Sequence, residues 1–137
     1  MGNNKTKRMD LFQGGYFKLH SGRISKFKIE CDALTDEDWE TMAGIVGKKL
    51  LFRDVIGIPT GGTKFAEKLD KYAKPESDLP ILVVDDVFTS GKSMERVRAE
   101  LGNNVIGVVL FARTIPPKWV TPVFQLYPDF DLEEDEK

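Results

Sequence analysis

Two adjacent carboxylates directly follow the most apolar stretch of the chain. Residues 81–84 have the pattern of a buried strand, and Asp85 and Asp86 come next. Successive side chains at a strand end point in opposite directions, so one carboxylate can face a ligand while the other braces the loop. Ionised carboxylates only accept hydrogen bonds, which suits them to vicinal hydroxyls or a metal ion. The pair therefore predicts a site for a diol.

A run of small and hydroxyl-bearing residues follows the acidic pair and leads into a predicted helix at residues 93–101. Amides at a helix N-terminus have no partner within the helix, and they form a ready site for a phosphate. A ligand with a diol at one end and a phosphate at the other, such as ribose 5-phosphate, would satisfy both halves. An ordinary capped turn is the alternative, but the order of strand, paired acids, glycine turn and helix favours binding. The phosphate-binding candidates are Thr89, Ser90, Gly91, Lys92 and Ser93.

A second glycine-containing loop follows the predicted strand at residues 54–58. Glycine lets the backbone approach phosphate oxygens closely, and a lysine at the end of the loop would add a positive charge. A plain strand-to-helix turn is the alternative for this loop taken alone. Its candidate residues are Thr60, Gly61, Gly62, Thr63 and Lys64.

Strand-like and helix-like stretches alternate along the chain. Short runs of Val, Ile and Leu indicate strands at residues 54–58, 81–84 and 105–111, and helical spacing indicates helices at 35–50, 63–72 and 93–101. Residues 35–38 have the capping-box pattern that is typical of a helix start. This alternation predicts an α/β fold, a Rossmann-like parallel sheet with helices on both faces. Ligands of such sheets bind at the carboxyl ends of the strands. Both loops fall at such ends, so we expect them to lie side by side.

The length of 137 residues predicts a single domain over residues 1–137. Residues 1–34 form an N-terminal segment with short strands expected at 16–19 and 26–29, and residues 129–137 form an acidic, solvated tail. The net charge of -2, without a basic stripe, argues against a nucleic-acid partner. No apolar run is long enough to cross a membrane, and the first ten residues lack the apolar core of a signal peptide. We therefore expect a cytoplasmic protein, with Cys31 as a half-buried structural thiol.

The stretch VVDDVFTSGKSM, residues 83–94, resembles the signature of type I phosphoribosyltransferases. The resemblance implies that Asp85 and Asp86 hold the ribose hydroxyls of phosphoribosyl pyrophosphate (PRPP) and that residues 89–93 wrap its 5-phosphate. One of the acids would also stabilise the positive charge that develops at C1 as pyrophosphate leaves. The loop at residues 59–64 resembles the pyrophosphate loop of the family. Mg2+ is expected on the diol and pyrophosphate oxygens, reaching Asp85 or Asp86 only through water.

The N-terminal segment narrows the resemblance. The stretches FKLHSGRIS, residues 17–25, and IECDAL, residues 29–34, look like the hood of a shortened orotate phosphoribosyltransferase, although an ordinary two-strand turn is the alternative. The acceptor would then be an orotate-like base. His20 stands where such enzymes carry a lysine, and Lys28 where they carry an aromatic residue. Both are candidates for the base pocket.

Two regions depart from the orotate pattern. Orotate enzymes have a strand and a long mobile loop before the acidic motif, but here residues 69–79 cannot hold both. A second subunit, as in a homodimer, or a different segment of the chain would have to cover the site, or the protein binds PRPP as a non-catalytic regulator. The segment around Trp119 resembles purine phosphoribosyltransferases instead, with Trp119 stacked on the base. The alternative is that Trp119 covers the edge of the sheet.

Overall fold

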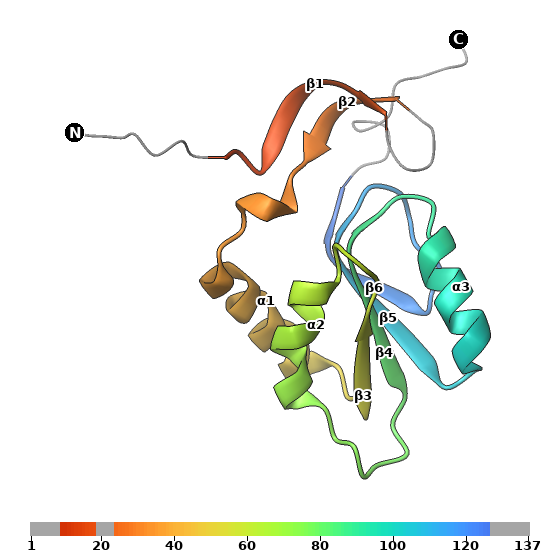
Figure 1. The fold of residues 1–137 in the computed structure, drawn as a ribbon. Coiled ribbons are helices and arrows are strands. Elements are labelled where there is room, and N and C mark those ends of the chain that lie inside the picture. Colours follow the sequence, from red (N-terminus) through yellow and green to blue (C-terminus); the bar gives the residue numbers. More distant parts are fainter. Residues whose placement is uncertain (1–8, 19–23, 127–137) are drawn as a thin grey trace.

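A four-stranded parallel sheet forms the centre of the fold (Figure 1). The computed structural model describes residues 9–18 and 24–126. The sheet has the order β3-β4-β5-β6, and all three pairs of neighbouring strands are parallel. The predicted parallel sheet is therefore confirmed. Its strands are β3 (Asp54–Gly57), β4 (Ile81–Phe88), β5 (Val105–Ala112) and β6 (Val120–Gln125).

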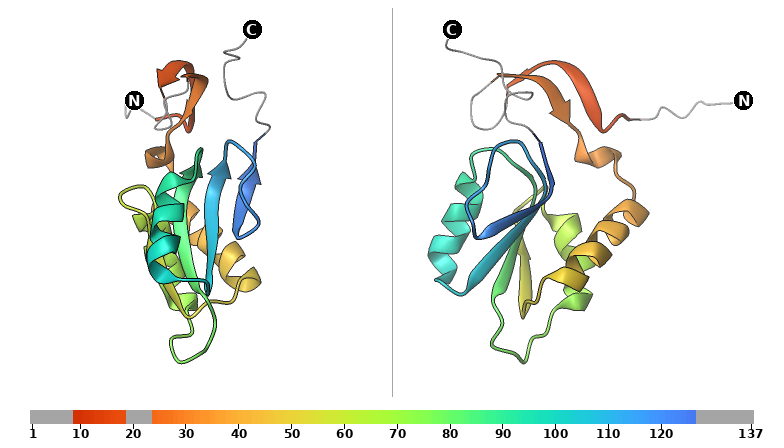
Figure 2. Two further views of the ribbon diagram at one scale, coloured as in Figure 1. Left: turned by 90° about the vertical axis from the view of Figure 1, so that its right-hand side faces the viewer. Right: turned by 180° about the vertical axis from the view of Figure 1, so that it is seen from behind.

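Helices cover both faces of this sheet (Figure 2). The helices α1 (Asp36–Lys49) and α2 (Thr63–Leu69) pack on one face, and α3 (Lys92–Leu101) packs on the other. Alternate residues of β4 point to opposite faces: Leu82 joins the cluster under α1 and α2, while Val83 joins the cluster under α3. This arrangement confirms the Rossmann-like architecture. No helix in the described part of the chain combines the length and the hydropathy that a membrane span requires.

Strand β4 is longer than we predicted. The sequence indicated a loop from Asp85 onward, but Asp85 pairs with Val109 and Val87 pairs with Phe111 of β5. The ladder continues because the two residues that follow the acids are apolar and fit the strand. The acidic pair therefore lies on the strand itself, where the sheet holds its backbone.

Strand β6 was not predicted, because Pro122 interrupts its apolar pattern. A proline has no amide hydrogen, so within sheets it is tolerated at edges. β6 is the edge strand next to β5, and Pro122 stands opposite Val109.

An antiparallel hairpin stands over the carboxyl end of the parallel sheet (Figure 1). It consists of β1 (Phe12–Lys18) and β2 (Ile24–Ile29), so both strands begin earlier than predicted. We call this hairpin the hood. Aromatic contacts join it to the sheet, because the ring of Phe12 lies 5.8 Å from Phe111 and 6.0 Å from Phe27.

The connection from α2 to β4 runs along the opposite end of the sheet (Figures 1 and 2). It forms a short 3-10 helix, Asp70–Tyr72, and no strand follows before β4. The ring of Tyr72 fills a notch in α1, where a Cβ on Gly47 would lie 2.4 Å from Tyr72 Cγ. The Lys74 amide donates to the Phe52 carbonyl at 2.9 Å. This connection is anchored far from the acidic pair.

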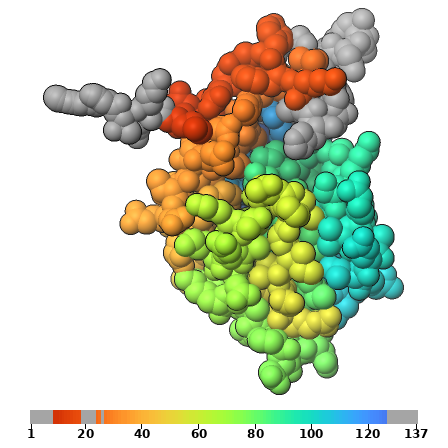
Figure 3. Space-filling model, in the orientation of Figure 1, coloured from red at the N-terminus to blue at the C-terminus, as the bar shows by residue number. Residues whose placement is uncertain are grey.

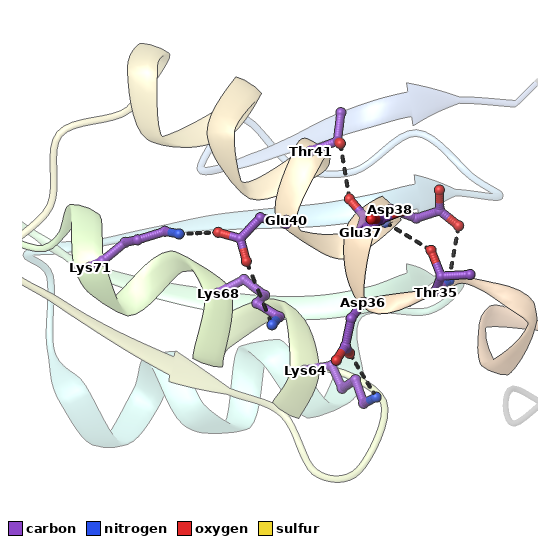
Figure 4. A network of polar contacts seen from close by, with 9 residues as sticks. All are labelled: Thr35, Asp36, Glu37, Asp38, Glu40, Thr41, Lys64, Lys68 and Lys71. Atoms are coloured by element: carbon purple, nitrogen blue, oxygen red, sulfur yellow. Dashed lines mark hydrogen bonds and ion pairs between the residues drawn. The ribbon is translucent and has the colours of Figure 1, made fainter.

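The capping box predicted at the start of α1 is present (Figure 4). Thr35 Oγ1 accepts from the Asp38 amide at 3.1 Å, and Asp38 Oδ2 accepts from the Thr35 amide at 2.9 Å. These two bonds satisfy amides that the helix itself leaves unpaired.

Loss of this cap should destabilise the whole domain. We expect Thr35→Ala to lower the free energy of unfolding by about 1 kcal/mol, measured by urea denaturation. Thr41→Ala is the control, because the exposed Thr41 hydroxyl donates only to the Glu37 carbonyl within the helix. Equal losses in the two variants would contradict a specific role for the cap.

Candidate functional site

The loop at residues 59–64 packs against the carboxyl end of β4, where the acidic pair lies. The Ile58 amide donates to the Val84 carbonyl at 2.8 Å. Gly62 lies so close to β4 that a Cβ there would be 2.3 Å from the Val84 oxygen, and a Cβ on Gly61 would be 2.4 Å from Asp86 Oδ2. The peptide between Pro59 and Thr60 is cis. The loop at residues 59–64 therefore lies against Asp86 at the end of β4, and glycine is what permits this close approach.

The acidic pair is partly buried and held by backbone amides. Asp85 Oδ1 accepts from the Asp86 amide at 2.9 Å, and Asp86 Oδ1 accepts from the Val87 amide at 2.7 Å. Burial first, and then the charge and hydrogen bond of Asp86, raise the pKa of Asp85 to about 8. A cation or a hydroxyl donor beside this carboxyl would favour its ionised form. The acidic pair therefore suits a ligand that places a cation or a hydroxyl donor beside it.

Cys31 is a neighbour of this pair that the sequence did not reveal. It begins the 3-10 helix Cys31–Ala33 after the hood, and its side chain is buried. Burial, followed by the charge of Asp86, raises the pKa of the thiol far above its ordinary value. A neutral thiol is a poor nucleophile, which agrees with the structural role that we expected.

The loop at residues 89–93 forms the N-terminus of α3, a helix of ten residues. Gly91 has a φ of 76°, and a Cβ there would lie 2.5 Å from the Phe88 ring, so only glycine fits this turn. The Thr114 hydroxyl donates to the Thr89 carbonyl at 2.6 Å, which ties the loop to the end of β5. Ser90 Oγ accepts from the Lys92 amide at 3.4 Å. These contacts fix the shape of the loop, which leads directly into the N-terminal amides of α3.

Lys64 lies on the first turn of α2 and faces α1 (Figure 4). Its Nζ pairs with Asp36 at 3.2 Å, and both side chains are largely exposed. Exposed ion pairs contribute little, so Lys64 can leave Asp36 at low cost. In the hood, Lys28 pairs with Glu30 at 2.8 Å. His20 lies outside the described residues.

Trp119 does not lie beside the two loops. Its indole nitrogen donates to Glu95 Oε2 at 3.0 Å, and the guanidinium of Arg98 stacks 4.9 Å from its ring. Both partners belong to α3, and the Trp119 carbonyl accepts from the Gly107 amide near the start of β5. These contacts favour the alternative that Trp119 covers the sheet and α3.

Arg113 is a buried charged residue whose position we did not predict. It follows β5 directly, and its guanidinium donates to Ser25 Oγ and to the Phe27 carbonyl, both at 2.7 Å. It also stacks on the Phe27 ring at 4.5 Å, while its amide donates to the Phe88 carbonyl. Arg113 therefore fixes the hood above the ends of β4 and β5. A charged residue immediately after an apolar strand was the signal available in the sequence.

No protein-family model matches the sequence, and no curated protein matches it. Solved structures do match the fold. Orotate phosphoribosyltransferase from Aeropyrum pernix superposes with a TM-score of 0.67 at 22% identity, covering 85% of this chain and 88% of that chain. The chain has the orotate phosphoribosyltransferase fold.

Two further orotate phosphoribosyltransferases agree. The Mycobacterium tuberculosis H37Rv protein, in complex with Fe(III) dicitrate, gives a TM-score of 0.57 at 15% identity and covers 84% of this chain and 89% of that chain. The Francisella tularensis protein gives 0.52 at 19% identity, with coverages of 79% and 69%. The predicted resemblance to a shortened member of the type I phosphoribosyltransferase fold is therefore confirmed.

The contact between Gly61 and Asp86 can be tested by adding one methyl group. Gly61→Ala should lower the free energy of unfolding by about 1–2 kcal/mol, because the new Cβ would push the Asp86 carboxylate out of place. Chemical denaturation measures the loss. Gly14→Ala in the hood is the control, since a Cβ there meets nothing within 4 Å. A Gly61→Ala protein as stable as the control would contradict the contact.

The raised pKa of Asp85 predicts a pH-dependent gain in stability for Asp85→Asn. Between the ordinary pKa of 3.8 and the raised pKa of about 8, the unfolded chain has lost a proton that the folded chain retains. Stability contributed by Asp85 is therefore lost as the pH rises through this window. Asparagine does not ionise, so the variant should exceed the unmodified protein by about 1–3 kcal/mol at pH 8.5 and by little near pH 4.5.

Thermal unfolding across this pH range measures the difference. Asp78→Asn removes a carboxylate from an exposed position and serves as the control. If the two variants follow the same pH dependence, the buried carboxyl is not the source of the effect.

Proposed function

We propose that the chain transfers the phosphoribosyl group of PRPP to a nitrogen of an orotate-like base and releases pyrophosphate. The supporting observation is the contact between Gly61 of the pyrophosphate-type loop and Asp86 of the acidic pair. Residues 89–93 stand at the same end of the sheet, at the N-terminus of α3. The diol, the 5-phosphate and the pyrophosphate of one PRPP molecule would thus each meet a suitable segment.

Each segment has a proposed role. Asp85 and Asp86 accept hydrogen bonds from the ribose hydroxyls, and their charge favours the cationic character of C1 in the transition state. Residues 89–93 bind the 5-phosphate through helix amides and hydroxyls. The loop at residues 60–63 binds the pyrophosphate through the amides of Thr60 and Gly61, because those of Gly62 and Thr63 already donate to backbone carbonyls. Lys64 joins them once it leaves Asp36. The bond from C1 to the pyrophosphate oxygen breaks, a bond from C1 to the base nitrogen forms, and that nitrogen loses its proton to solvent.

The acidic pair suits Mg2+ as a partner of the substrate. The described residues contain no group of three or more His, Cys, Asp or Glu side chains that could hold a metal alone. Mg2+ tolerates few protein ligands and binds through substrate oxygens and water, so Asp85 or Asp86 would reach it through a water molecule. Bound there, the metal would neutralise charge on the leaving pyrophosphate.

The hood supports an orotate-like acceptor. It stands over the carboxyl end of the sheet, where Arg113 fixes it through Ser25 and Phe27. We propose that His20 and Lys28 of this segment bind the base anion. The argument for a purine acceptor depended on Trp119 stacking on the base. Trp119 packs on α3 instead, which removes that support.

A second candidate function is PRPP binding without turnover. The observation in its favour is the short connection from α2 to β4, which is anchored at the far end of the sheet by Tyr72. A transferase must exclude water from the reacting C1, and this connection cannot reach it. In the transferase proposal, a second copy of the chain in a homodimer would have to cover the site.

Donor binding and turnover separate these functions. Calorimetry with PRPP and Mg2+ should show saturable binding, which the double variant Asp85→Asn with Asp86→Asn should abolish because the diol loses its charged acceptors. The exposed pair Asp70→Asn with Asp78→Asn changes the net charge equally and should leave binding intact.

Pyrophosphate release is then measured in a single turnover with orotate and with a purine base. Release that requires orotate supports the transferase. Binding without release from either base would assign the second function. Absence of binding, or equal binding by the two double variants, would contradict both.

A further inference from the structure

Strand β3 is an edge strand with a hollow beside it. Within the described residues its sheet neighbour is β4 alone, so the backbone of its other side has no strand partner. In Figure 3 this segment (yellow) reaches the surface beside α2 (green). An open hollow of about 360 Å3 lies here, lined by Val55, Gly57, Thr63, Ala66, Glu67 and Asp70.

Charges on α2 and on the 3-10 helix that follows it are separated between two sides. Three lysines face α1 and pair with its carboxylates: Lys64 with Asp36, and both Lys68 and Lys71 with Glu40 (Figure 4). Two acids, Glu67 and Asp70, line the hollow instead. In residues 9–18 and 24–126 no lysine or arginine forms an ion pair with either acid. The hollow beside β3 therefore has an acidic rim, and the nearby cations are engaged elsewhere.

We propose that the open edge of β3 binds an extended segment of a partner protein in which alternate residues are lysine or arginine. Such a segment would continue the sheet through backbone hydrogen bonds, and one row of its side chains would point into the hollow. Residues two apart on a strand are about 7 Å apart, which is close to the spacing of about 5–6 Å between helix positions three apart, such as Glu67 and Asp70.

The hollow fits the stems of these side chains as well as their charges. Val55 and Ala66 give it an apolar floor, on which the methylene groups of lysine or arginine pack while the cations reach the rim. In the free chain, the Val55 amide donates to the carboxylate of Asp54 at 2.8 Å. This local bond occupies an edge amide, which limits pairing with unselected strands, and the partner segment displaces it. The docking does not depend on the proposed function.

Short synthetic peptides test the docking on the full chain in the absence of PRPP. The probe is a fluorescein-labelled octapeptide that alternates lysine with threonine, and anisotropy measures its affinity. A peptide that alternates glutamate with threonine should not bind. N-methylation of alternate amides on the face toward β3 keeps every charge but removes the ladder bonds, and it should weaken binding about tenfold or more.

Charge reversal locates the site. Glu67→Lys should weaken the lysine peptide about fivefold more than Glu100→Lys, because Glu100 is exposed on α3 and changes the net charge identically. Three results would overturn the proposal: equal affinity for the N-methylated peptide, equal effects of the two reversals, or no binding of the lysine peptide. A dimer of the chain that excludes the peptide would assign the edge to a second copy instead, and would overturn it too. PRPP binding is tested in a separate experiment. Its failure would contradict the proposed function but not the peptide docking, because the peptide assay contains no PRPP.

Discussion

The Asp86 carboxylate and the backbone of Gly61 touch with no space for a side chain between them, and the rest of the site depends on this contact. The amide of Ile58 bonds to the carbonyl of Val84, so the register between β3 and β4 sets where the first loop stands. The ladder between β4 and β5 in turn sets where Asp85 stands. Sheet register, rather than loop flexibility, thus determines the distance between the two halves of the site.

This arrangement lowers the stability of the protein when no ligand is bound. A carboxyl is held where burial and a like charge oppose its ionisation, and the Val87 amide holds its neighbour Asp86. Functional sites are where a sequence departs from the rules that maximise stability. Here the cost falls on β4, which pairs with β3 as far as Val84 and with β5 as far as Phe88, so the ladder to β5 can hold the acids in place.

The sequence predicted the elements whose signals are local. The capping box and apolar spacing of α1 gave its bounds to within a residue, and glycine loops after apolar runs located both halves of the site. Features set by distant partners were missed. Asp85 indicated a loop because its pairing with β5 is not visible locally, and the proline of β6 hid a strand. The contact between Ser25 and Arg113 spans 88 residues, beyond the reach of any local pattern.

The placement of Pro122 has a consequence for how sheets of neighbouring molecules can join. A proline supplies no amide hydrogen, and it stands in the outermost strand on one side of the sheet. The opposite margin, at β3, keeps its amides. Lateral growth is therefore one-sided: a strand added at β3 finds donors, whereas the β6 side disfavours a second addition. Such polarity works against the open-ended stacking of strands that produces fibres.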